Sequence, residues 1–250
     1  QLPSASSFSG LELEPGSTLY SGSADIDNAF YRFRVPDGLA DQFSLPTIPA
    51  GALGLDSLDG VGLPAHTQIL PVVTVLPMGW AWSLHFCQSV MMRAISDCGF
   101  TPDRIIQDRS ASPTIGPTTG CAAAGYVDNV LVVGTSPEDV NLRLGKVIKV
   151  LETQGLVVHE KEAASSKSEF VGLSIDGDRG IISIKTSRLF RLRDAIHELL
   201  RRNHSSGVLL EVLLGHHGLY FFVVSSCVYL MAATRSSPNT GVTVPVLLSA

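Results

Sequence analysis

The sequence is poor in cysteine and in charge, and each shortage excludes a class of protein. Four cysteines are spread over 250 residues without a C-x-x-C pair, which argues against a zinc site and favours buried free thiols in a reducing compartment. Charged residues make up only 16% of the chain, and the net charge is −5. That balance argues against a uniformly basic nucleic-acid-binding protein, although arginines cluster between Arg179 and Arg202 as a local basic stripe.

The chain also lacks a basic segment followed by an apolar one at its start, so no secretory signal is visible and an intracellular location is expected. Its first residue is glutamine rather than methionine, which favours a piece of a longer polyprotein. The stretch 212–234 has no formal charge apart from His216 and His217 and approaches the length of a membrane span. Because histidine is costly in lipid, we expect a buried helix and no stable membrane association, with a membrane anchor as the distant alternative.

Apolar residues are abundant, at 45% of the total, which is enough for one large domain or two modest ones. The most informative apolar stretch is 125–134, with the sequence GYVDNVLVVG. Asp and Asn tolerate the backbone of a tight turn, while Val, Leu and Tyr favour strands, so this stretch predicts a β-hairpin with Asp128 at its tip. Taken alone, the pattern is more typical of an ordinary surface turn.

A second acidic motif, Asp25-Ile26-Asp27, lies far upstream of the hairpin. In a strand, the two-residue period would place Asp25 and Asp27 on one face, where like charges either meet water or bind a cation. The competing interpretation is a helix N-terminus, where acids in the first turn complement the helix dipole.

Caps and apolar spacing predict three helices. The first covers residues 82–98, begins after the strand-breaking Pro77-Met78-Gly79 and ends at Gly99. The second covers residues 137–154, with Ser136 as its N-cap. The third follows Ser187, and its arginines fit either a solvated face or a helix that lies along a phosphate backbone. The predicted strands are 43–48, 68–75, 156–159, 170–175 and 181–184.

Five motifs in a fixed order carry a resemblance to a known family. They are Asp25-Ile26-x-x-Ala29-Phe30, Leu76-Pro77-x-Gly79-Trp80-x-x-Ser83 with Gln88, Tyr126-Val127-Asp128, Gly155-Leu156 with His159 and Lys161, and Phe170-Val171-Gly172. Each motif is modest alone, but in this order and at this spacing the sequence resembles the palm of reverse transcriptases, the RNA-directed DNA polymerases of retroelements. It looks more similar to a retrotransposon enzyme than to a retroviral one. The resemblance runs from about residue 21 to residue 175, with a thumb to about residue 234.

The resemblance implies a nucleotidyltransferase, in which a primer hydroxyl attacks the α-phosphate of a dNTP and pyrophosphate leaves. Two Mg²⁺ or Mn²⁺ ions roughly 4 Å apart can activate the attacker and neutralise the leaving oxygens, and such hard ions prefer oxygen ligands. Asp25 and Asp128 occupy the catalytic, metal-binding positions, and the backbone carbonyl of Ile26 would complete one coordination shell. Lys161 lies where the family often has a lysine beside the pyrophosphate, as a candidate general acid.

The same resemblance implies the contacts to nucleotide and template. The backbone amides of Asn28 and Ala29 would face the triphosphate, and Phe30 is at the position of an aromatic gate that excludes ribonucleotides at the sugar 2′ position. Met78 and Gly79 would support the incoming base pair. The residues implied on the template–primer side are Trp80, Gln88, Tyr126, Arg188, Arg191, Arg201 and Arg202.

The sequence departs from the family's pattern at several places. Asn129 stands where a second Asp is usual, so the metal site loses one negative charge, and Asp27 is a candidate to replace it in part. Met78 replaces a residue that is polar in retroviral relatives, and Leu84 replaces a frequent proline. The chain starts just before Asp25, so most of the fingers, with the basic residues that grip the triphosphate, is missing. Two interpretations follow: an active polymerase, or a truncated and catalytically inactive remnant that retains only nucleic-acid binding.

The predicted fold class is α+β, a polymerase palm with an antiparallel sheet backed by two helices, followed by a mainly helical thumb. The expected parts are an extended or partly disordered N-terminal segment (1–20), a palm (21–184) that includes a remnant of the fingers (37–75), a helical thumb-like region (185–235) and a tail (236–250). The expected partners are an RNA or DNA template-primer and dNTPs.

Overall fold

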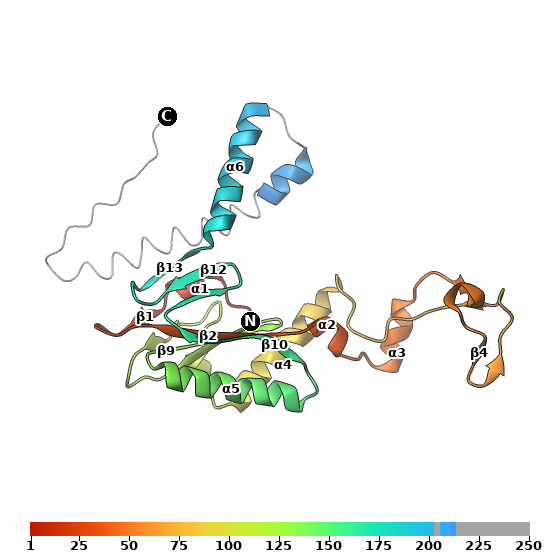
Figure 1. The fold of residues 1–250 in the computed structure, drawn as a ribbon, viewed down its shortest axis with the longest axis horizontal. Coiled ribbons are helices and arrows are strands. Elements are labelled where there is room, and N and C mark those ends of the chain that lie inside the picture. Colours follow the sequence, from red (N-terminus) through yellow and green to blue (C-terminus); the bar gives the residue numbers. More distant parts are fainter. Residues whose placement is uncertain (203–205, 214–250) are drawn as a thin grey trace.

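An antiparallel sheet of four strands, in the order β10-β2-β9-β8, forms the centre of the structure (Figure 1). The structure is a computed structural model that describes residues 1–202 and 206–213. All three strand pairs are antiparallel, as predicted for the sheet that carries Asp25. The bounds are Tyr20–Ile26 for β2, Ala122–Tyr126 for β8, Asn129–Gly134 for β9 and Val158–Ser165 for β10.

The two central strands bury side chains on both faces of this sheet, because successive side chains of a strand alternate in direction. Ala24 and Val130 join one buried cluster with residues of α4 and α5, whereas Leu131 and Val133 join a second cluster with residues of α1 and β12. Figure 1 accordingly shows α4 and α5 on one side of the sheet and α1, β12 and β13 on the other. The central strands are therefore stabilised from both sides.

Two 17-residue helices, α4 (Ala81–Asp97) and α5 (Pro137–Thr153), back the sheet and confirm the predicted helices to within one residue at each end. Ser136 caps α5, since its hydroxyl accepts a hydrogen bond from a backbone amide of the first turn at 3.1 Å. Gly99 and Gly155 follow the ends of the two helices with φ of +86° and +84°, a left-handed conformation that glycine adopts without strain.

A second sheet of three strands packs on the opposite face and contains one strand more than predicted. The hairpin of β12 and β13 is confirmed, but the predicted strand 170–175 is wrong, because Val171 and Gly172 form a turn with φ of +47° and +83°. The residues before this turn form the additional strand. The bounds are Lys167–Phe170 for β11, Leu173–Asp176 for β12 and Ile181–Ile184 for β13.

The N-terminal segment is folded onto the second face rather than extended or disordered, which corrects the prediction for residues 1–20. It contains α1 (Ala5–Ser9) and β1 (Glu12–Leu13), and β1 pairs in parallel with β7 (Thr114–Ile115). Phe8 is only 3% exposed, and its ring lies 5.8 Å from that of Phe170. The burial of Phe8 and the pairing of β1 with β7 thus attach a segment whose Ser-rich composition indicates disorder.

Residues 41–75 form an arm that extends away from the body in Figure 1. The predicted long strands 43–48 and 68–75 are wrong; they shorten to a two-residue ladder of β3 and β6 and isolated bridges. Prolines at 46, 49 and 71 explain the shortening, because proline cannot donate to a strand ladder. The elements from β2 to the arm's end are α2 (Ala29–Arg32), α3 (Asp37–Ala40), η1 (Asp41–Phe43), β3 (Ile48–Pro49), η2 (Ala50–Leu53), β4 (Ser57–Leu58), β5 (Val61–Gly62) and β6 (Gln68–Ile69).

The third predicted helix is α6 (Thr186–Arg202), which follows β13 and rises from the body (Figure 1). Residues 207–213 are helical as well. The rest of the predicted thumb, the His216-His217 pair with most of its apolar stretch, and the tail lie outside the described residues. Within the described ranges, no helix combines the length and apolarity that crossing a membrane requires.

Arg104, at the end of η3 (Pro102–Arg104), holds the loop beside β8 to the sheet. Its guanidinium donates hydrogen bonds to the carbonyl oxygens of Thr114 at 2.8 Å, Gly120 at 2.6 Å and Cys121 at 3.1 Å. The carbonyl of Thr114 and those of the adjacent Gly120 and Cys121 therefore converge on a single cation.

We expect Arg104→Ala to lower the free energy of unfolding by about 2–3 kcal/mol, because partly buried carbonyls lose charged donors. Urea unfolding followed by circular dichroism would measure the change. Arg93→Ala is the matched control, since the Arg93 side chain is 81% exposed and lies 4.0 Å from Asp97; its change should stay below about 0.5 kcal/mol. Equal losses in both variants would contradict the role assigned to Arg104.

Candidate functional site

The pairing of β2 with β9 brings together the two acids that the sequence analysis selected. Asp25, the penultimate residue of β2, lies opposite Asn129, the first residue of β9. The next amide of β2, that of Ile26, donates a hydrogen bond to the carbonyl oxygen of Asp128 at 2.9 Å. The segments that carry Asp25 and Asp128, from remote parts of the chain, are therefore joined through their backbones at one end of the central sheet.

Asp25, whose side chain is 22% exposed, has a pKa above that of an ordinary aspartate. Burial raises the pKa of Asp25 to about 6, and the negative charge of Asp128 adds to the rise. His159 opposes it: its Nδ1 lies 3.6 Å from Asp25 Oδ1 and favours the carboxylate. The site thus concentrates negative charge in a partly dehydrated place, which favours a cation.

The hairpin turn lies one residue earlier than predicted. Tyr126 pairs with Asn129, so the two turn residues are Val127 and Asp128, and Asn129 already belongs to β9. Val127 has a φ of +58°, which is a strained conformation for a β-branched residue. Its side chain is buried at 5% exposure, so packing stabilises the turn that holds Asp128.

Gln88 supports the strained turn from below. Its side-chain amide donates to the carbonyl oxygen of Gly125 at 2.8 Å and accepts from the amide of Val127 at 2.7 Å. The residue lies on α4 and is only 7% exposed. The resemblance implies a position on the template side for Gln88. In the structure its side chain binds the backbone of the hairpin, a role that the sequence did not indicate.

A cluster of apolar side chains connects the turn with the other predicted nucleotide contacts. Phe30, Trp80 and Tyr126 pack against a small core that contains Val127 and Cys87. Burial raises the pKa of the Cys87 thiol to about 11, and the charge of Asp128 contributes, which places this core close to the site.

The loop before α4 supplies the remaining predicted base-pair contacts. Met78 is 67% exposed, and Gly79 adopts a φ of +92°, which requires glycine there. The hydroxyl of Ser83, on the first turn of α4, donates to the carbonyl oxygen of Pro77 at 2.8 Å and so closes the loop. Trp80, between them, packs edge-on against Phe43 with ring centroids 5.0 Å apart.

The segment after Asp25 turns sharply into α2. Asn28 has a φ of +50° and precedes Ala29, which is buried. Asp27 lies beyond the end of β2, and its carboxylate forms an ion pair with Arg32 at 2.6 Å. The strand geometry that would place Asp27 on the face of Asp25 is therefore wrong, and Arg32 neutralises the charge that Asp27 was expected to contribute to the site.

Lys161 lies on β10, but its ammonium is turned away from the acids. It is 2.7 Å from Glu152 of α5, the helix that covers the face opposite Asp25. The neighbour Glu162, in contrast, accepts a hydrogen bond from Ser23, two residues before Asp25 on the same strand. His159, not Lys161, is the residue of β10 that contacts Asp25. A regular strand would place both residues on one face, but the pairing with β2 shifts register between His159 and Glu162, where Glu160 has a φ of +46°.

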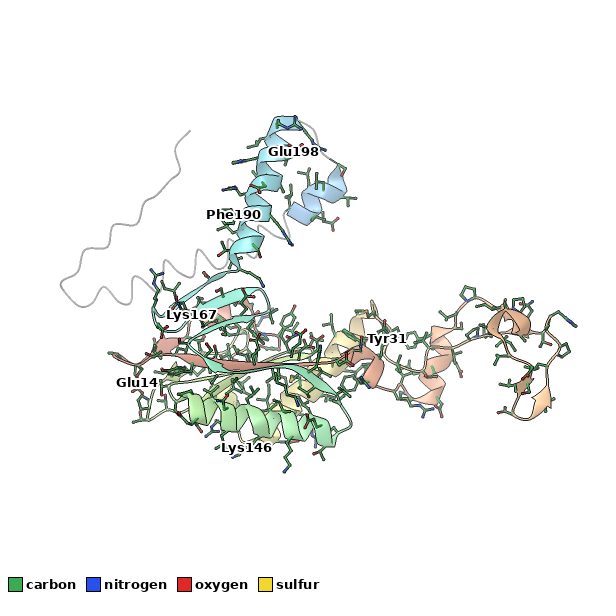
Figure 2. The ribbon with its side chains drawn as sticks, in the orientation of Figure 1. Glu14, Tyr31, Lys146, Lys167, Phe190 and Glu198 are labelled. Atoms are coloured by element: carbon green, nitrogen blue, oxygen red, sulfur yellow. The ribbon has the colours of Figure 1, made fainter. Side chains whose placement is uncertain are left out.

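The predicted template-side arginines lie on α6 (Figure 2) and are in part already paired. Arg201 and Arg202 bind Glu198 at 2.7 Å and 2.6 Å. Arg191 is exposed, and the side chain of Arg188 lies outside the described part of the structure. The basic stripe therefore remains at the surface, with its charge reduced by acids of the same helix.

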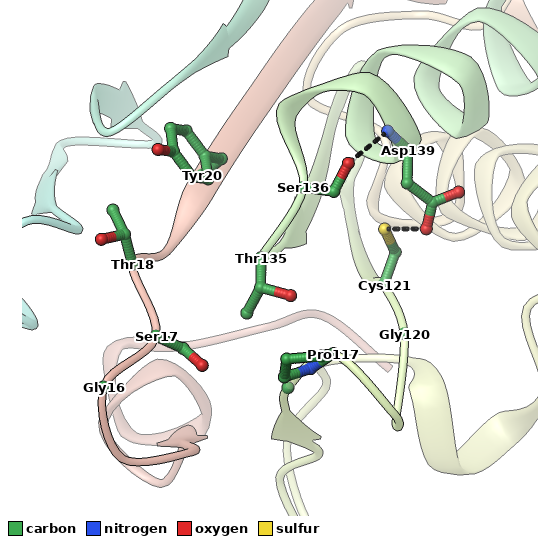
Figure 3. A pocket seen from close by; sticks show the side chains of 11 residues that line it. Gly16, Ser17, Thr18, Tyr20, Pro117, Gly120, Cys121, Thr135, Ser136 and Asp139 are labelled. Atoms are coloured by element: carbon green, nitrogen blue, oxygen red, sulfur yellow. Dashed lines mark hydrogen bonds between the residues drawn. The ribbon is translucent and has the colours of Figure 1, made fainter.

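A cavity of about 510 Å³ lies at the other end of the central sheet, where β2 begins and β9 ends (Figure 3). The thiol of Cys121 donates to Asp139 at 3.1 Å in its wall, and burial raises the pKa of that thiol to about 12. The cavity is remote from the paired acids. Its other lining residues are Gly16, Ser17, Thr18, Tyr20, Gly116, Pro117, Gly120, Thr135 and Ser136.

Solved structures of reverse transcriptases resemble this fold. The foamy viral protease–reverse transcriptase bound to double-stranded DNA has a TM-score of 0.54 and 13% sequence identity, over 98% of this chain and 35% of that one. The same viral protein bound to an RNA/DNA hybrid has a TM-score of 0.51 and 13% identity, over 86% of this chain and 23% of that one. No family model and no curated protein matches the sequence.

These similarities show the fold: a mixed α+β structure with antiparallel sheets that resembles reverse transcriptases. The chain spans 23% to 35% of the length of the two viral chains that it matches. Within residues 1–202 and 206–213, no group of three or more His, Cys, Asp or Glu side chains is arranged to hold a metal ion. Asp25 and Asp128 are therefore not part of a larger cluster of such side chains within these residues.

We expect Asp25→Asn to stabilise the metal-free protein at neutral pH. Folding raises the pKa of Asp25 from 3.8 to about 6, so the folded state binds the proton more tightly than the unfolded state does. The stability that Asp25 contributes through this proton is fully present below pH 3.8 and is lost as the pH rises through about 6. Removing the charge should raise the free energy of unfolding at pH 7 by about 1–2 kcal/mol in a buffer with chelator. Urea unfolding at several pH values would measure it.

The pH dependence provides the internal control for this prediction. Near pH 4, where Asp25 is protonated, variant and parent should have equal stability. A stability difference that does not change between pH 4 and pH 7 would show that charge at Asp25 is not responsible.

Proposed function

We propose that this chain is the phosphoryl-transfer part of a template-directed DNA polymerase of the reverse-transcriptase type, a nucleotidyltransferase acting on an RNA or DNA template. The observation that carries the proposal is the pairing of Asp25 with Asn129, with the hydrogen bond from the Ile26 amide to the Asp128 carbonyl oxygen, which joins the two acidic segments at one end of the sheet. The similarity of the fold to reverse transcriptases supports it. The foamy viral relatives were solved with an RNA/DNA hybrid and with double-stranded DNA, and we extend that kind of partner to this chain.

The donor set fits magnesium. Mg²⁺ is commonly held by one or two carboxylates together with substrate phosphates, so two acids suffice when a triphosphate supplies the remaining oxygens. Burial is the larger cause of the raised pKa of Asp25 and the negative charge of Asp128 adds to it, so a divalent cation would favour the ionised carboxylate. We therefore propose that Asp25, Asp128 and the carbonyl oxygen of Ile26 hold two Mg²⁺ or Mn²⁺ ions, which when bound would activate the primer hydroxyl and neutralise the leaving group.

The chain's other residues would position the reactants. Phe30, packed against the core below the turn, is the candidate for the gate at the sugar, and the backbone of Asn28 and Ala29 would face the phosphates. Met78 and Gly79, both exposed, would lie under the incoming base pair. His159 contacts Asp25 and would keep this carboxylate oriented. A protonated group beside the pyrophosphate is not assigned, because Lys161 is paired with Glu152.

A second candidate function is nucleic-acid binding without catalysis. Two observations favour it: Asn129 leaves the site with one carboxylate fewer than the family's pattern, and no lysine or arginine occurs between Arg34 and Arg93 to grip a triphosphate. Under this alternative, the surface near α6 would still bind a duplex through exposed arginines such as Arg191.

We expect Asp128→Asn to reduce extension of a DNA primer on a short RNA template by at least about 100-fold, because a metal-binding carboxylate is lost. Gel analysis of primer extension with Mg²⁺ and dNTPs would measure it. Asp97→Asn, at the exposed end of α4, is the matched control and should retain full activity.

Three results would change the assignment. Activity that persists undiminished in Asp128→Asn would be attributed to a contaminating polymerase and would remove the support for catalysis. A parent chain that binds the duplex but extends no primer would favour the binding function. Loss of activity in Asp27→Ala, whose carboxylate is paired with Arg32, would show that Asp27 replaces the charge missing at Asn129.

We expect Asn129→Asp to lower the thermal stability of the metal-free protein and to increase the stabilisation that magnesium provides. The amide of Asn129 donates to Asp128 Oδ1 at 2.8 Å, and an added carboxylate would exchange that hydrogen bond for repulsion. In chelator, the melting temperature should fall by about 3 °C, and Mg²⁺ should raise it more in the variant than in the parent. Asn141→Asp on α5 adds the same charge away from the site and is the control. An identical magnesium shift in all three proteins would contradict binding at these acids.

A further inference from the structure

The arm formed by residues 41–75 has almost no core of its own. Ala50 is its one buried residue, and none of its side chains joins the three buried clusters of the described structure. Its strands form two sheets of two strands each, which are marginal in water without a packing partner. The apolar side chains that it exposes are Leu45, Leu53, Leu58, Val61, Leu70 and Val72, with exposed fractions between 38% and 68%.

The charge of the arm excludes a phosphate backbone as its partner. Residues 41–75 contain three aspartates, Asp41, Asp56 and Asp59, and neither lysine nor arginine, a net charge of −3. Nucleic-acid binding depends on cations that neutralise phosphates, and the arm has none. The same net charge on a second arm would repel it, so pairing of two arms is disfavoured.

The complementary surface occurs on α6. Residues 186–202 contain five arginines and two acids, a net charge of +3, and expose Leu189, Phe190 and Leu200. Figure 2 shows Phe190 and Glu198 on this helix, well away from the arm, so the two surfaces of one molecule do not cover each other. One surface is apolar and acidic, the other apolar and basic, and both are exposed in the part of the chain that the structure describes.

We propose that the arm of one copy docks on α6 of a second copy of this chain. The contact joins two different surfaces, so each copy keeps one arm and one helix available, and assembly produces rings or chains. Burial of the exposed leucines, valines and Phe190 supplies the attraction, and the aspartates and arginines set the orientation. The inference does not depend on polymerase activity.

Sedimentation velocity of the full chain without nucleic acid tests this contact. We expect concentration-dependent self-association that weakens as salt is raised, because exposed opposite charges are screened. The double variant Asp41→Lys/Asp56→Lys, and separately Arg191→Glu/Arg193→Glu, should each weaken association by about tenfold or more. Combining all four substitutions in one chain restores opposite charges across the contact and should recover association.

One control and one further variant make the result specific. Lys146→Glu/Lys149→Glu reverses exposed charges on α5, away from both surfaces, and should leave association unchanged. Leu58→Ser/Val61→Ser alters exposed side chains of the arm and should weaken association at high salt as well, with an unchanged circular dichroism spectrum. A chain that stays monomeric at all concentrations would overturn the proposal. Failure of the variant with all four substitutions to recover association would overturn it as well. Primer extension is measured separately, so failure here leaves the proposed function standing.

Discussion

The arrangement of the site depends on one stretch of backbone pairing, that of β2 with β9. This ladder runs from Tyr20 opposite Gly134 to Asp25 opposite Asn129, and its last hydrogen bond joins Ile26 to Asp128. A slip of one residue would send the side chain of Asp25 to the helix-covered face, because successive side chains alternate. The apolar side chains of both strands prevent the slip, since each face of the sheet already has a matching cluster. Ordinary core packing thus holds two repelling acids together.

The support of the hairpin shows how the protein retains an unfavourable local geometry. Val127 is strained and Asp25 is partly dehydrated beside another acid, and both conditions oppose formation of the folded state. Gln88 and the apolar cluster under the turn offset these unfavourable terms. Gln88 lies on α4, which belongs to a different part of the sequence. Such local conflict with global stability is typical of functional sites.

The sequence predicted those features that depend on short-range chemistry. Helices α4 and α5 were predictable from caps and apolar spacing, and the hairpin of β12 and β13 from its Gly-containing turn. The turn at Val127 was not, because propensity favours Asp-Asn and the register is set by the pairing with β2. The position of Gln88 also could not be predicted: a glutamine on a helix carries no signal that it binds a hairpin far along the chain. Phe8 illustrates the same limit, since its burial and the pairing of β1 with β7 hold in place a segment whose composition indicates disorder.

The contact between Gln88 and the turn determines how partial unfolding of α4 would affect the two acids. The amide of Val127 has its partner on α4, so fraying of that helix would release the hairpin tip before the central sheet separates. Damage to the helix would then appear as misalignment of the acids in a chain that still gives the spectrum of a folded protein. Misalignment of the two acids and unfolding of the sheet are consequently separable here, and Gln88 and the apolar cluster under the turn are what connect the acids to α4.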